Sequence, residues 1–146
     1  MPLPSYAAFD ESDLGAQVLL SQHKLTNSGD AVTVRQAVSR YMKENGASAL
    51  SVTRFATAVS EIARNAIVHA GGGEFSIYVD RSRKQLTVVC WDNGPGIADV
   101  TLALSDGYTS GGGLGRGLGG AQRLAGKFEI RTAVDAGTSV LMSVNL

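Results

Sequence analysis

The sequence predicts an α/β protein of the α+β type, a two-layer sandwich in which helices cover one face of a mixed, mostly antiparallel sheet. Segments with strand-like and helix-like periodicity follow in the order strand, helix, helix, strand, strand, long loop, helix, strand, strand. Short turns join consecutive strands into hairpins, which makes most neighbouring strands antiparallel. The helical segments have apolar stripes that can gather on one side of the sheet.

The composition is that of a folded protein. The chain has 146 residues, of which 44% are hydrophobic and 18% charged, so we expect one domain with a substantial core. Lys and Arg together number 13, as do Asp and Glu, and the formal net charge is +0. We therefore expect neither a nucleic-acid partner nor a membrane partner. No apolar run approaches the length of a membrane span, and a cytoplasmic location is expected.

Cysteine and histidine usage argues against a disulfide and against a transition-metal site built from protein alone. Cys90 is the single cysteine and lies in an apolar, strand-like segment, so we interpret it as a buried structural thiol. His23 and His69 are far apart in the sequence and have no cysteine nearby.

The N-terminal third is predicted to contain an arm, a strand and a helix. Residues 1–15 show little periodicity, so we expect a flexible arm with a short helix near Asp10–Leu14. The folded domain is predicted to span residues 16–146 and to begin with a strand over Gln17–Thr26, with apolar side chains on one face. After a turn that offers an N-cap, Ala31–Glu44 has helical spacing.

The longest predicted helix runs from about Ser48 to Ala70, between an Asn-Gly signal and three consecutive glycines. The elements after it are shorter. They are strands at Glu74–Asp80 and Gln85–Trp91, helices at Ala98–Leu104 and Leu118–Ala125, and strands at Lys127–Val134 and Thr138–Val144.

The long helix carries the first candidate site. Apolar residues recur at helical spacing from residue 52 to residue 66, while Glu61, Asn65 and His69 follow one another at i, i+4 and i+8 on a neighbouring stripe. A carboxylate and a carboxamide at the margin of a buried face suggest the wall of a pocket. The alternative is an ordinary amphipathic helix whose polar face meets water.

The second candidate site follows the predicted central strand. Asp92 lies where the chain must turn, and Gly94 and Gly96 permit backbone angles or close approaches that other residues do not. A carboxylate held there could accept a hydrogen bond from an exocyclic amine such as that of adenine, and Gly96 would leave room for a flat ring. The alternative is a plain β-turn.

The third candidate site is the glycine-rich run from Gly111 to Gly120, which leads into a helix. Backbone N–H groups without side chains can surround an anion, and a helix N-terminus adds favourable partial charge. Arg116 is the only fixed cation in the run and could meet a phosphate. A flexible linker is the alternative. The P-loop pattern is absent, and no strand leads directly into the run as a dinucleotide-binding motif would require.

Taken in order, these motifs resemble those of the GHKL ATPase superfamily, which includes gyrases and histidine kinases and has the Bergerat-type ATP-binding fold. The resemblance covers about Gln17 to Leu146. The matching motifs are Glu61-x-x-x-Asn65 for the N box, Asp92-x-Gly94-x-Gly96 for the first glycine box, Gly111–Gly117 for the second box in the nucleotide lid, and Gly137-Thr138 for the terminal Gly-Thr.

Within the superfamily, the chain resembles the small bacterial anti-sigma and switch kinases of partner-switching systems. Residues 61–65 and 106–115 are most similar to the RsbT-type switch kinases. The resemblance implies an ATP-dependent serine/threonine kinase that phosphorylates STAS-domain proteins of the stressosome and then activates a PP2C-type phosphatase by binding. The alternative is an anti-sigma factor that sequesters a sigma factor through nucleotide-dependent binding. A split histidine kinase is disfavoured because no acceptor domain is evident.

The resemblance also implies residue roles. Glu61 would be the general base that accepts the proton of the attacking hydroxyl, and Asn65 would bind both ATP and its Mg²⁺ ion through the carboxamide oxygen. Asp92 would bind the adenine amine with support from Thr138. The remaining ATP-binding residues would be Gly94 and Gly96 in the base pocket, Gly111, Gly113, Gly115 and Gly117 in the lid, and Arg116 near the phosphates. Arg64 would either reach the phosphates as a further ATP-binding residue or pack outward.

Overall fold

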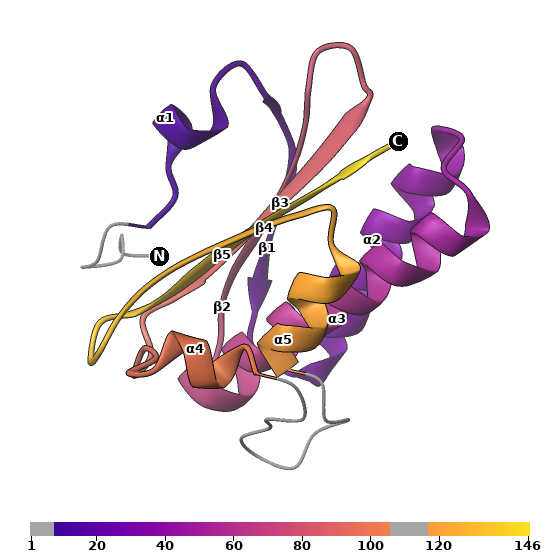
Figure 1. Ribbon diagram of the computed structural model, residues 1–146. Helices are drawn as coiled ribbons and strands as arrows, with labels where there is room; N and C mark the ends of the chain where they lie inside the picture. Colours follow the sequence, from indigo (N-terminus) through magenta and orange to yellow (C-terminus); the bar gives the residue numbers. More distant parts are fainter. Residues whose placement is uncertain (1–7, 106–116) are drawn as a thin grey trace.

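A five-stranded sheet forms one layer of the molecule, and helices pack against one of its faces (Figure 1). The computed structural model describes residues 8–105 and 117–146. The strands lie in the order β1-β2-β3-β5-β4. They are β1 (Val18–Leu25), β2 (Gly73–Val79), β3 (Gln85–Asp92), β4 (Lys127–Ala133) and β5 (Gly137–Asn145).

The predicted two-layer architecture is confirmed, with one correction to the sheet. Every neighbouring pair of the described strands is antiparallel, so the sheet is not mixed. The pairing of β3 with β5 places the third strand beside the last, and β4 then lies at the edge. This order is what brings the ends of β3, β5 and β4 together at one corner of the sheet.

The helices occupy the positions that the sequence predicts, with ends that differ by a few residues. They are α1 (Glu11–Leu14), α2 (Ser28–Glu44), α3 (Ala49–Ala70), α4 (Val100–Ala103) and α5 (Gly117–Leu124). The main core lies between the sheet and α2, α3 and α5, and its largest fully buried side chains include Phe55, Phe75 and Met42. None of the helices within the described ranges has the length and apolar character needed to cross a bilayer.

Capping residues fix the ends of the long helix α3. The Ser48 side chain accepts a hydrogen bond from the Ser51 backbone N–H at 3.1 Å, which satisfies one donor of the first turn. At the other end Gly71 adopts a left-handed conformation with φ of 73° and donates its N–H to the Ile67 carbonyl at 3.2 Å. The chain leaves α3 at Gly71 and enters β2 at Gly73.

The N-terminal half of β1 lies outside the core. The exposed fractions of Val18, Leu19 and Leu20 are 44%, 45% and 37%, and the pairing with β2 shifts register between Leu19 and Ser21. This irregularity interrupts the alternation of the strand, so its apolar residues do not form one buried face. The other end of the strand is anchored by Leu25, which is 1% exposed.

The segment before β1 packs on the sheet face opposite the large helices. Phe9 and Leu14 are 7% and 6% exposed, and they form a second buried cluster with Val89 and Leu141. The sequence predicts a flexible arm for residues 1–15; the part described, from residue 8, is instead held against the sheet. The predicted short helix is present as α1, and the proposed domain limits remain a prediction.

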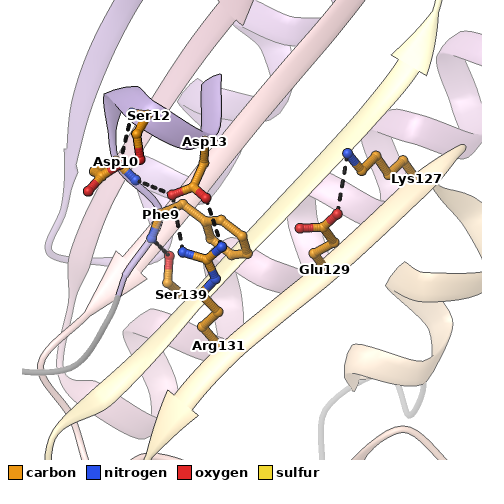
Figure 2. A network of polar contacts seen from close by, with 8 residues as sticks. All are labelled: Phe9, Asp10, Ser12, Asp13, Lys127, Glu129, Arg131 and Ser139. Carbon is orange, nitrogen blue, oxygen red and sulfur yellow. Dashed lines mark hydrogen bonds and ion pairs between the residues drawn. The ribbon is translucent and has the colours of Figure 1, made fainter. Parts of the chain in front are cut away.

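Arg131 on β4 holds the segment before β1 against the sheet through an ion pair and a ring contact (Figure 2). Two Arg131 guanidinium nitrogens donate to the Asp13 carboxylate at 2.7 and 3.1 Å, and the guanidinium lies 4.1 Å from the centroid of the Phe9 ring. The bonded guanidinium lowers the pKa of Asp13. The Phe9 N–H also donates to Ser139 Oγ at 3.5 Å. One arginine thus combines a bidentate ion pair with ring stacking.

Candidate functional site

Asp92 ends the central strand β3 and faces the helix side of the sheet. Its alternation with Cys90 and Val88, both in the main core, places the carboxylate on that side, and the residue is 8% exposed. The Gly94 N–H and the Thr138 N–H both donate to Asp92 Oδ1, at 2.9 and 3.2 Å. Backbone groups therefore orient the carboxylate before any ligand arrives.

Burial raises the pKa of Asp92, because removing the carboxylate from water disfavours its charged form. The two backbone hydrogen bonds and the nearby charge of His69 act in the opposite direction and lower this pKa. A buried carboxylate with a specific charged neighbour is a common feature of functional sites. His69 itself is exposed near the end of α3.

Thr138, at the start of β5, links Asp92 to β4. Its side-chain oxygen lies 2.9 Å from Oγ1 of Thr132, and Thr132 Oγ1 in turn donates to the Gly137 carbonyl at 2.8 Å. The Ile97 N–H donates to the same threonine oxygen at 3.0 Å. The loop after Asp92 is therefore bonded to the β4–β5 hairpin through this hydroxyl group, and also through the Asp135 N–H, which donates to the Pro95 carbonyl at 2.7 Å.

Gly94 and Gly96 lie where protein atoms leave no room for a side chain. A Cβ at Gly94 would lie 2.4 Å from the Ala70 Cβ, so this residue lets the loop touch the end of α3. A Cβ at Gly96, whose φ is +72°, would lie 2.1 Å from the Ala133 carbonyl oxygen on β4. The close approach of the β4 backbone therefore requires glycine at position 96, and the contact of Gly96 with a flat ring stays a prediction.

The residues predicted on α3 share a helical face. Glu61 is 8% exposed, while Arg64 and Asn65 are half-buried. Glu61 and Asn65 are one turn apart, so the two side chains lie on the same face of α3. An 8% exposed glutamate is what distinguishes this arrangement from a solvated amphipathic helix.

The predicted lid is described only at its C-terminal end. Gly117, with φ of 50°, begins α5, which packs against α3. The glycines predicted to close over phosphates, and the arginine among them, lie outside the described residues: Gly111, Gly113, Gly115 and Arg116.

The structure brings Asp92, Gly94 and Thr138 into direct contact and places the end of α3 beside them. Sequence reasoning missed Thr132. The signal available was its place in β4, where Phe128, Ile130 and Thr132 alternate onto the core side, so that a polar residue follows two apolar ones just before the turn.

Metal binding by protein side chains alone has no support in the described ranges. They contain no group of three or more His, Cys, Asp or Glu side chains arranged to hold an ion. Asn65 offers one hard oxygen ligand, the kind that Mg²⁺ prefers when phosphates and waters supply the others. Cys90 is buried as predicted, with Sγ 3.8 Å from the Ile62 carbonyl, and burial raises the pKa of the thiol and keeps it protonated.

Comparison with known proteins identifies relatives over most of the chain. The histidine kinase-like ATPase domain matches residues 26–144. The chain is 36% identical over 119 residues to the serine/threonine-protein kinase RsbT of Bacillus subtilis, an alignment that covers 80% of this chain and 90% of that protein. It is 28% identical over 129 residues to an anti-sigma F factor of Clostridium novyi, covering 84% and 90%.

A solved structure shares the fold. The crystal structure of the RsbU and RsbW domains of a Mycobacterium tuberculosis protein matches 85% of this chain with a TM-score of 0.57 and 18% sequence identity. The chain spans 32% of the length of that larger protein, so the match supports the architecture alone.

Proposed function

Because the chain belongs to the histidine kinase-like ATPase domain family, we propose that it is an ATP-dependent protein serine/threonine kinase of a bacterial partner-switching pathway. Its 36% identity to the kinase RsbT, over 90% of that protein, favours this activity within the family. The structural observation that carries the proposal is the buried Asp92 carboxylate, held by Gly94 and Thr138 at the end of the central strand.

Adenine recognition follows from the chemistry of that corner. The exocyclic amine of adenine donates two hydrogen bonds, and an ionised carboxylate only accepts them. Asp92 Oδ1 is bonded to two backbone donors, which fixes the direction of the side chain and limits its loss of freedom when ATP binds. Asp92, Thr138, Gly94 and Gly96 are therefore proposed to shape the base pocket.

Phosphoryl transfer is proposed to use the polar face of α3. Glu61 would accept the proton of a serine or threonine hydroxyl as that oxygen attacks the γ-phosphorus of ATP. The bond from the γ-phosphorus to the β–γ bridging oxygen would break at the same time, and ADP would leave. Asn65 would contribute its carboxamide oxygen to Mg²⁺, which supplies charge neutralisation on the phosphates when bound. Arg64, half-buried on the same helix, is proposed to reach the phosphates.

The glycine-rich lid is proposed to close over the phosphates. Gly111, Gly113, Gly115 and Gly117 would bring backbone N–H groups close to the anion, and Arg116 would add positive charge. This part of the proposal rests on the sequence, because Gly117, at the start of α5, is the one predicted lid residue that lies within the described residues.

The proposed protein substrates are STAS-domain proteins, which would also serve as scaffold, and the proposed target of activation is a PP2C-type phosphatase. These partners come from the resemblance to switch kinases, and a cytoplasmic location is proposed with them. The Mg²⁺ requirement is proposed on the same basis, supported by the position of Asn65 on α3.

An anti-sigma function is the second candidate. Its specific support is the 28% identity to an anti-sigma F factor over 90% of that protein. In that case nucleotide would set the shape of a surface that sequesters a sigma factor. The two candidates separate on their binding partners: a switch kinase releases its phosphorylated substrate and binds a phosphatase, whereas an anti-sigma factor forms a stable complex with a sigma factor.

The proposal is tested by incubating the chain with γ-labelled ATP, Mg²⁺ and a STAS-domain protein from the same genome. Label on a serine or threonine of the STAS protein supports the kinase. Saturable ATP binding without label transfer, together with a stable sigma-factor complex, moves the protein to the second candidate. Absence of ATP binding by the folded protein contradicts both.

A further inference from the structure

Three polar side chains form one row across the sheet at the site corner. The strand registers pair Asp92 with Thr138, and Thr138 with Thr132, so the row crosses β3, β5 and β4 in that order. Directly paired residues point to the same side of a sheet. For these three it is the helix side, because Cys90, Val140 and Ile130, two residues away on the same strands, pack in or against the main core.

The hydrogen bonds of Thr132 determine where each hydroxyl proton goes. A threonine hydroxyl has one proton to donate and can accept two hydrogen bonds. Thr132 Oγ1 lies 2.8 Å from the Gly137 carbonyl oxygen, which can only accept, so the Thr132 proton is committed to that carbonyl. The contact of 2.9 Å to Thr138 Oγ1 then requires Thr138 to be the donor. The Ile97 N–H fills the second acceptor position of Thr132 at 3.0 Å.

Thr138 consequently presents only acceptor character toward the pocket. Its proton is directed at Thr132. Its register partner Asp92 points to the same side of the sheet, and the Asp92 carboxylate is also an acceptor when ionised. The corner therefore offers two acceptors and no hydroxyl donor. The 6-amino group of adenine, with two N–H donors, matches this pattern, whereas the 6-oxo group of guanine would place a third acceptor against the other two.

We propose that Thr132 is a positioning residue that fixes the Thr138 hydroxyl as an acceptor and thereby sets the preference of the site for 6-amino over 6-oxo purine nucleotides. This inference rests on the proposed function, because it assumes that the base binds beside Asp92. Thr132 acts through Thr138 and does not itself contact the base. Loss of the Thr132 oxygen frees the Thr138 proton to rotate toward the pocket, where it can donate to a 6-oxo group.

The test compares the Kd values for ATP and GTP, each with Mg²⁺, in the wild type and in Thr132→Val. The expected result is that the Kd for GTP divided by the Kd for ATP is lower in Thr132→Val than in the wild type by about tenfold or more. The main cause is that GTP binding improves relative to ATP binding. A merely structural role for Thr132, such as holding the loop through the Ile97 N–H, would weaken both nucleotides equally and leave the ratio unchanged.

Three further variants complete the design. Thr132→Ser retains the hydroxyl and should restore the wild-type ratio, while Thr87→Val applies the same change at a buried β3 position far along the strand and should leave the ratio unaltered. Thr132→Ala removes the same hydroxyl without a branched side chain and replaces the valine variant if that one does not fold.

The outcomes separate this inference from the proposed function. A wild type that prefers ATP, with a hydroxyl-free variant that keeps the same preference, overturns the role of Thr132 and leaves the kinase proposal standing. A folded wild type that binds neither nucleotide overturns both.

Discussion

The backbone N–H of Thr138 donates a hydrogen bond to Asp92 Oδ1 across the β3–β5 pair, at 3.2 Å. This contact joins Thr138, near the start of β5, to Asp92, the last residue of β3, although the two residues are 46 positions apart in the sequence. It orients the one buried carboxylate that the described part of the molecule holds at this corner. The proposed recognition of adenine depends on that orientation.

Replacing Asp92 with asparagine should weaken ATP binding by about 1–3 kcal/mol, because the change turns a buried charged acceptor into a neutral amide. Isothermal titration with ATP and Mg²⁺ measures the effect. Asp135→Asn is the matched control, since this exposed turn residue has a positive φ of 62° that asparagine also tolerates. Unchanged ATP affinity in a folded Asp92→Asn protein would remove the adenine contact from the account.

The same substitution should change the pH dependence of stability. Burial raises the pKa of Asp92 above its unfolded value, so the contribution of this residue to stability is fully present below the unfolded pKa and is lost as the pH rises through the folded pKa. Asp92→Asn lacks this loss. Denaturant unfolding of both proteins between about pH 3 and about pH 7 should therefore show the variant gaining stability relative to the wild type as pH rises. A difference that is independent of pH contradicts this reasoning.

Gly96→Ala should destabilise the protein by about 1–3 kcal/mol, because a left-handed backbone must accept a Cβ and the Ala133 carbonyl must move. Gly46→Ala separates the two causes: its φ is +83°, yet a Cβ there has open space around it. The difference between the two unfolding free energies gives the cost of the contact with β4. Equal losses would show that Gly96 is required for its backbone angle alone.

Phe9→Ala should lower the free energy of unfolding by about 3 kcal/mol, as expected for truncating a buried aromatic side chain. The substitution removes the ring beneath the Arg131 guanidinium and opens the second buried cluster. Leu50→Ala, at a side chain that is 70% exposed, is the control and should have little effect. If the loss is as small as that of the control, the N-terminal segment contributes no stability.

Most of the architecture could be predicted because local signals agree with the fold. The spacing of apolar residues located the described strands and the longer helices. The predicted start of α2 at Ala31 differs from the observed start at Ser28, because the Asn27 side chain accepts the Gly29 N–H and caps the helix there. The second neighbour of β3, after β2, was harder to assign. β5 pairs with β3 although a long stretch of sequence separates them, so the two strands do not form a hairpin.

Site residues could be predicted from the sequence where the residue type itself indicates the chemistry. They were harder to predict where their role depends on a contact with another residue. Asp92, Glu61 and Asn65 stand out by type and spacing, whereas Thr132 gains its importance only from its register with Thr138. The packing of Phe9 was missed for a similar reason. Its partners Val89 and Leu141 lie far away in the sequence, and a segment of a few residues shows no periodicity.

The most direct test of the kinase mechanism is single-turnover transfer from γ-labelled ATP to a STAS-domain protein by Glu61→Gln. Glu44→Gln, the same change at an exposed helical position, is the control. If Glu61 is the general base, the variant should bind ATP with near-normal affinity and transfer phosphate at least ~10²-fold more slowly than the wild type. Near-normal transfer by Glu61→Gln would contradict the role of Glu61 and with it the proposed mechanism.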